Sequence, residues 1–193
     1  MHNLENKIPS KNINYTPAHI ANFFIVKSQQ DGINLDPMKL LKLVYIAYGW
    51  NLAINDSKLF NEPILAWNYG PVIASLYHEI RAFPFNDKNN LDKDFRCAIY
   101  QEDSVTSKAT NIPHVDDDDV KVIRVLDAVW INYKKFDGIS LSKITHEDGS
   151  PWHQAYFGNG KNAQLDDELI KKRSIEAIEK FIEREKNKNE QAS

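Results

Sequence analysis

The chain has one cysteine and little net charge, and both shortages exclude classes of protein. A single thiol, Cys97, cannot form an internal disulfide framework or, by itself, a thiolate metal site. A formal net charge of −3 over 193 residues gives no general attraction to nucleic acid. The basic residues that cluster from Lys171 onward alternate with glutamates, as on a solvated helix face. We therefore do not expect nucleic-acid binding as the main role.

Long apolar runs and catalytic signatures are also missing. No run approaches the ~18 apolar residues that a membrane helix needs, and the first residues, MHNLENKIPSKN, are too polar for the apolar core of a signal peptide. We therefore expect a cytoplasmic protein without a membrane segment. The sequence contains no glycine-rich phosphate loop, nucleophile elbow or dinucleotide fingerprint. These absences favour a binding protein without a cofactor over an enzyme.

The composition is that of one folded domain with polar ends. Hydrophobic residues make up 42% and charged residues 26% of the chain, which is ordinary for a globular domain with a proper core. Residues 1–14 are polar and lack periodicity, so we expect a flexible arm there. The charged and polar residues 186–193 predict a disordered tail. A single domain is expected over residues 15–185.

Two similar signals mark the first two helices. Thr16 and Asp36 are each followed by a proline, and this order places a capping side chain before a proline at the first helical position. The second helix, from Pro37 to about Ile54, has apolar residues around most of its circumference, which is typical of a helix in the middle of a core. We predict a mainly α (α+β) fold, a compact helical domain around this central buried helix.

Further helices follow from capping residues and helical spacing. They are expected from Pro71 to about Phe83, from the acidic run Asp116–Asp119, in a short segment capped by Ser140, from Pro151, and from near Asp166, the last either continuous or broken near Arg173. The acidic run would need further oxygen ligands to bind a metal, whereas carboxylates in a first turn interact favourably with a helix N-terminus. The apolar run Ile64–Trp67 is expected to form a small antiparallel β element with the alternating run Phe95–Tyr100.

A sharp turn is expected in the stretch EPILAWNYGPVIASLY. Gly70 can adopt dihedral angles that Tyr69 cannot, and Pro71 fits the first position of a helix. Trp67 and Tyr69 flank this turn with large rings that carry polar tips. The turn is therefore either a packed corner or a protruding binding site.

The most enzyme-like group consists of His146, Glu147 and His153. Zinc proteases place two histidines one turn apart on a helix, as HExxH, whereas Gly149 and Pro151 interrupt the chain between these two. A metal-dependent hydrolase that uses His146 and His153 is therefore the alternative hypothesis. We favour a structural histidine whose ring bonds to the backbone.

The run AWNYGPV resembles the Panacea domain of the SocA-like antitoxins of bacteria and phages. SLY follows this run, LKLVYIAYGWNLA precedes it, and ITHEDGSPW occurs much later; the resemblance covers about Tyr15 to Ile182. Its most specific residues are Ala66, Trp67, Tyr69, Gly70, Pro71, Val72, Thr145, His146, Pro151 and Trp152.

The resemblance implies an antitoxin of a type II toxin–antitoxin system, which neutralises a protein toxin encoded by an adjacent gene by binding it. It leaves two routes open, sequestration of the toxin or its delivery to the ClpXP protease by a proteolytic adaptor. The residues that it implies as partner-binding or fold-defining, none of them catalytic, are Trp67, Tyr69, Gly70, Pro71, Thr145, His146, Pro151 and Trp152. They would form one surface if the fold joins the two motifs.

Overall fold

The computed structural model of the chain describes residues 15–82, 97 and 112–191. Within them the fold is mainly α-helical with a small two-stranded antiparallel sheet, as the sequence predicts. The elements are α1 (Pro17–Asp31), α2 (Pro37–Asn55), β1 (Ile64–Trp67), β2 (Gly70–Ile73), α3 (Ala74–Ala82), α4 (Val120–Tyr133), α5 (Gly138–Thr145), α6 (Pro151–Asn159) and α7 (Asp167–Gln191). None of the helices in these ranges combines the length and the apolar character that a membrane span requires.

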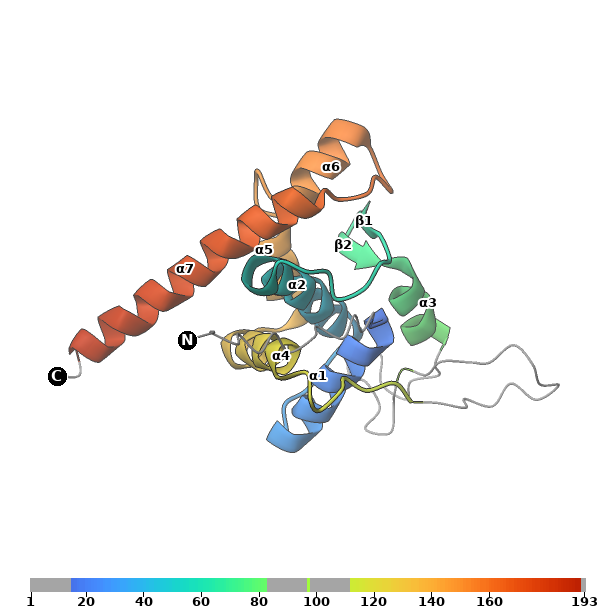
Figure 1. Cartoon of the computed structure of the whole chain (residues 1–193). Helices are drawn as coiled ribbons and strands as arrows, with labels where there is room; N and C mark the ends of the chain where they lie inside the picture. The colour runs from blue at the N-terminus through green and yellow to red at the C-terminus, as the bar shows by residue number, and fades with distance from the viewer. Residues whose placement is uncertain (1–14, 83–96, 98–111, 192–193) are drawn as a thin grey trace, which may run out of the picture.

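Helix α2 lies at the centre of the fold (Figure 1). Its N-cap, Asp36, accepts a hydrogen bond of 2.8 Å from the backbone N–H of Lys39. Every residue from Lys39 to Leu52 is buried, and α1, α4, α5 and α7 all contact this helix. The prediction of a central buried helix is therefore confirmed.

The β1–β2 hairpin contains Pro71 in its second strand, opposite Ala66. The expectation that a helix starts at Pro71 is wrong, because α3 begins only at Ala74. Pro71 fits a strand because Ala66 directs its backbone groups to the other edge of β1. There the N–H of Ala66 donates to the carbonyl of Ala163, and the carbonyl of Ala66 accepts from the N–H of Asn162, both at 2.8 Å. A proline is tolerated where no ladder hydrogen bond needs its N–H.

Strand β1 has neighbours on both edges. β2 pairs with one edge, and residues 162–165 bond to the other, where the N–H of Leu165 donates to the carbonyl of Ile64 at 2.8 Å. Within the described residues both edges of β1 are therefore occupied, and β2 takes the place expected for the run Phe95–Tyr100. Apart from Cys97, that run lies outside the described residues.

A buried side-chain amide on α1 fixes two points of the connection between α3 and α4. Asn22 donates from Nδ2 to the carbonyls of Cys97 and Pro113, at 2.9 and 2.8 Å, and accepts from the N–H of Cys97 at 2.8 Å. Burial raises the pKa of the Cys97 thiol. This thiol is therefore a packed, protonated group and not a nucleophile.

Aspartates cap α4 and α5. Asp119 accepts from the backbone N–H of Val122 at 3.3 Å, so the acidic run before α4 supplies the helix cap. α5 begins at Gly138, and its cap is Asp137, whose Oδ1 accepts from the N–H of Ser140 at 2.7 Å. The expectation of Ser140 as the cap is wrong by three residues, because either an aspartate or a serine can satisfy the free N–H groups of a first turn.

Helix α7 is continuous over 25 residues and runs along α2 and past it (Figure 1). Of the two forms that the sequence allows, a continuous helix and a helix broken near Arg173, the structure has the continuous one. The two helices approach closely at Gly49, where an added Cβ would overlap the Oγ of Ser174. Residues 186–191, expected in a disordered tail, continue the helix, and residues 192–193 lie outside the described part.

Candidate functional site

The two motifs singled out in the sequence meet at the turn of the β1–β2 hairpin. α5 contacts β2, α6 contacts β1, and α2 packs against β2. We call this region the hairpin junction and define it by Lys42, Trp67–Pro71, Ser142, His146, Trp152 and Tyr156. Its hydrogen bonds join residues that are up to 88 positions apart in the chain, as Asn68 and Tyr156 are.

Gly70 is required at the turn for two reasons. Its φ is +102°, a backbone conformation that side chains other than hydrogen strongly disfavour. In addition, an added Cβ would lie 2.5 Å from Nζ of Lys42 and 2.8 Å from Cε1 of His146. Backbone conformation and close packing therefore both demand glycine, which supports the prediction that Gly70 forms the sharp turn.

Lys42 holds the hairpin turn from the side of the central helix. It is 3% exposed, and its Nζ donates to the carbonyls of Tyr69 and Pro71 at 2.7 and 3.0 Å. Ser142 also donates to the Tyr69 carbonyl, at 3.3 Å. Burial lowers the pKa of Lys42 to about 7. The amine can donate to both carbonyls in its neutral or its charged form.

His146 packs its ring against Trp152, with the ring centroids 4.0 Å apart. Its Nδ1 lies 2.6 Å from the carbonyl oxygen of Ser142, so Nδ1 must carry a proton, because a carbonyl can only accept. Its Nε2 faces the carbonyl of Asn68 at 3.4 Å. Both ring nitrogens thus face backbone carbonyls, as expected for a structural histidine.

Helix α6 binds the opposite side of the turn. The indole N–H of Trp152 donates to the carbonyl of Trp67 at 2.8 Å, and the hydroxyl of Tyr156 donates to Oδ1 of Asn68 at 2.9 Å. The Trp152 and Tyr156 rings are stacked, with centroids 4.9 Å apart. The helix starts at Pro151, as predicted, and Ser150 caps it by accepting from the backbone N–H of His153 at 3.1 Å. The turn is therefore held on two sides.

The sequence-predicted site residues lie at different depths. Buried among them are Gly70, Pro71, Thr145, Pro151 and Trp152. Trp67 and His146 are half-buried, whereas Tyr69 is 76% exposed. Gly70, Pro71 and Trp152 are therefore part of the packing of the junction, whereas Thr145 and Pro151 line a cavity beside α7. The ring of Tyr69 is accessible to a partner.

A second exposed aromatic ring belongs to the same region. Phe157 on α6 is 69% exposed, and its ring lies edge-on to Trp152 with centroids 6.0 Å apart. Single exposed apolar side chains are common on protein surfaces, but Phe157 packs against Trp152 of the same junction that carries Tyr69. Tyr69 and Phe157 therefore mark the accessible part of the hairpin junction.

The two histidines of the metal hypothesis have other contacts. His146 faces the two carbonyls described above, and Nε2 of His153 lies 3.5 Å from Oδ1 of the exposed Asp148. Across residues 15–82, 97 and 112–191, no group of three or more histidine, cysteine, aspartate or glutamate side chains is arranged to hold a metal ion. The described residues thus supply no ligand set for a hydrolase built on His146 and His153.

Sequence reasoning missed Lys42, Asn68 and Ser142. One signal for Lys42 was present, because it stands among the apolar residues that surround the central helix, where a charged side chain needs a partner. Asn68 and Ser142 look like ordinary loop and surface residues. Only the folded arrangement shows that they connect the hairpin to α5 and α6.

Comparison with known families gives the class of this protein. The family model described as "Antitoxin SocA-like, Panacea domain" matches residues 40–153, which include Lys42, the hairpin and the His146–Trp152 pair. The chain belongs to this family. Membership supports an antitoxin role, with a toxin as the general kind of partner.

A curated relative agrees with this assignment. The protein named Antitoxin SocA, from Caulobacter vibrioides (strain NA1000 / CB15N), is 26% identical over 158 residues, which are 80% of this chain and 79% of the relative. No solved structure matches the chain.

Proposed function

We propose that this chain is the antitoxin of a type II toxin–antitoxin system and neutralises its cognate toxin by direct binding at the hairpin junction. The observation that carries the proposal is the 76% exposure of Tyr69 on a turn whose backbone is fixed by buried contacts. In this proposal the toxin is encoded by an adjacent gene and the complex forms in the cytoplasm. No residue of the junction acts as a catalyst.

The backbone under Tyr69 is prepared for binding. Lys42 and Ser142 both donate to the Tyr69 carbonyl, so the backbone of Tyr69 is already restricted before a partner binds. A binding residue that is already ordered costs less conformational entropy when a partner arrives. Lys42 and Ser142 therefore fix the position of the backbone that carries the exposed ring.

Aromatic side chains are suitable anchors for such a surface. Tyrosine and tryptophan are enriched among the residues that dominate binding energy, usually near the centre of an interface. A stable interface buries roughly 1,200 to 2,000 Å² in total, far more than one ring provides. We expect Tyr69 near the centre of the contact and Phe157 within it.

Coexpression with the neighbouring gene tests the proposal. The neighbour alone should arrest growth, and this chain should restore it; Tyr69→Ala should abolish the rescue without lowering the melting temperature. Ile131→Ala is the matched control, because Ile131 is 66% exposed on α4, which is not part of the junction. A harmless neighbour, or full rescue by Tyr69→Ala, would contradict binding through this surface.

Delivery of the toxin to a protease is the second route that the proposal allows. In a host without ClpXP, an antitoxin that sequesters its toxin should still rescue growth. An adaptor should form the same complex but fail to rescue, because the toxin would not be degraded. Toxin half-life, measured in both hosts after synthesis is stopped, separates the two routes.

A further inference from the structure

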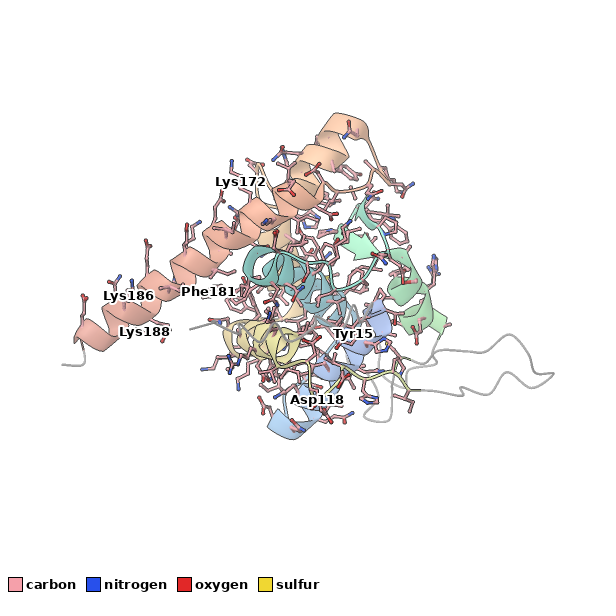
Figure 2. All side chains as sticks on the ribbon, in the orientation of Figure 1. Tyr15, Asp118, Lys172, Phe181, Lys186 and Lys188 are labelled. Carbon is pink, nitrogen blue, oxygen red and sulfur yellow. The ribbon has the colours of Figure 1, made fainter. Side chains whose placement is uncertain are left out.

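A cavity that opens to solvent lies between α7 and the core, and no residue of the hairpin lines it. Its volume is about 280 Å³, and it lies between α2, the end of α4, the end of α5 and α7. Its apolar walls include Ile46, Trp50, Phe136 and Phe181. Figure 2 shows Phe181 on the side of α7 that faces the core, in agreement with its ring contacts to Trp50 and Tyr133.

One hydroxyl opens into this cavity and has no hydrogen-bond partner among the described residues. Tyr45 is 8% exposed, and no residue in the described part of the chain bonds to its hydroxyl. Burial raises the pKa of Tyr45, so the hydroxyl keeps its proton and remains a donor. An oxygen of a ligand in the cavity can accept this hydrogen bond in place of water.

The charged residues around the cavity are mostly cationic. Arg173 lines it and pairs with Glu147 and Glu176. Lys180 and Arg184 line it as well, and neither pairs with a carboxylate in residues 15–82, 97 and 112–191. Arg184 instead lies over the ring of Phe181, 5.8 Å from its centroid. An anion would therefore find two unpaired cations at this cavity.

We propose that this cavity binds a small organic carboxylate with an aromatic or branched aliphatic body. The body packs against Trp50 and Phe181, the carboxylate pairs with Lys180 and Arg184, and the hydroxyl of Tyr45 donates to an oxygen of the ligand. The cavity volume of about 280 Å³ lies just below the roughly 300 Å³ at which pockets for drug-sized ligands begin, so it suits a smaller compound. This ligand site goes beyond the proposed toxin binding and does not depend on it.

Ligand binding here has a consequence for α7. The cavity is bounded by α2 on one side and α7 on the other, so a bound ligand adds contacts across the α2–α7 interface. A ligand that binds only the folded form raises its stability in proportion to the logarithm of its concentration above Kd. The melting temperature should therefore rise with ligand concentration.

Four acids serve as probes: phenylacetate, 3-phenylpropionate, indole-3-acetate and 4-methylpentanoate. Each is titrated into the full chain by calorimetry and followed by the indole N–H signal of Trp50, and each is compared with its uncharged amide. We expect at least one acid to bind, its amide to bind about tenfold more weakly, and Lys180→Gln with Arg184→Gln to weaken the acid about tenfold.

Two further variants complete the test. Tyr45→Phe keeps the ring and should weaken the acid several-fold through loss of one hydrogen bond. Lys172→Gln is the charge-matched control, because Lys172 is exposed on α7 and does not line the cavity (Figure 2); it should bind the acid like the wild type. The proposal is overturned if no acid binds at about 10 mM, a concentration far above ordinary ligand-site Kd values. Equal binding of acid and amide, or unchanged binding by the double variant, overturns it as well.

Discussion

Nζ of Lys42 lies 2.7 Å from the carbonyl oxygen of Tyr69, so a buried amine on the central helix holds the backbone of the most exposed large side chain in the hairpin. The carbonyl of Pro71 is the second acceptor, at 3.0 Å. This relationship connects the core of the domain directly to its candidate binding surface.

Lys42→Met should lower the affinity for the toxin while leaving the protein folded. The change removes a buried amine and leaves two carbonyls without their donor, so the turn loosens although the core keeps its volume. Lys39→Met is the matched control, because Lys39 is also a buried lysine of α2 but donates to Asn34 and Lys134, away from the hairpin. Equal affinity of both variants for the toxin would mean that Lys42 does not position the turn.

The same lysine predicts a pH dependence of stability. Its pKa is about 7 in the folded protein, whereas a free lysine has a pKa of about 10.4. Between these values the unfolded chain binds the extra proton, so the contribution of Lys42 to the free energy of unfolding rises with pH and is least favourable below pH 7.

Urea unfolding of the wild type and Lys42→Met at several pH values measures this contribution. The difference between the two, wild type minus variant, should grow by up to about 1.4 kcal/mol per pH unit from pH 7 toward pH 10. Other titrating groups cancel in the difference. A constant difference across this range would show that the pKa of Lys42 is ordinary.

Gly70→Ala should destabilise the protein by about 2 to 4 kcal/mol, through backbone strain and through the close approach of Lys42 and His146. Gly149→Ala separates the two effects, because Gly149 also has a positive φ, +74°, but has open space at the Cβ position. That control should lose only about 1 to 2 kcal/mol. Equal losses in urea unfolding would remove the packing part of the explanation.

The central helix makes a separate prediction. Leu43 is fully buried, so Leu43→Ala should lower the free energy of unfolding by about 2 to 5 kcal/mol. Ile54, in the same helix, is 52% exposed, and Ile54→Ala should cost less than about 1 kcal/mol. A loss below about 1 kcal/mol for Leu43→Ala would contradict the burial of α2.

Local signals made much of the helical fold predictable. The side chains of Asp36 and Ser150 cap their helices by accepting from N–H groups only three residues further on, so a short window of sequence is enough. The Gly70–Pro71 pair was misread because the same residues suit a helix start and a strand after a tight turn. The neighbours of β1, which decide between the two, lie partly at residues 162–165.

The candidate site was predictable only in part. The two motifs contain most of its residues. The hydrogen bond between Lys42 and Tyr69, however, joins residues 27 positions apart, and no sequence pattern indicates such a pair. The sequence also did not indicate which motif residues are buried and which are exposed. Tyr69 and Trp152 are both aromatic motif residues, yet one is exposed and the other donates its N–H inside the junction.

The affinity of purified Tyr69→Ala for the purified toxin tests the central claim most directly. Calorimetric titration should show tight binding by the wild type and by Ile131→Ala, and a loss of roughly thirtyfold or more for Tyr69→Ala, as expected for an interface anchor worth about 2 kcal/mol. Melting temperatures should be the same for all three proteins, since Tyr69 is 76% exposed. Undiminished affinity of Tyr69→Ala would contradict toxin binding through the hairpin junction.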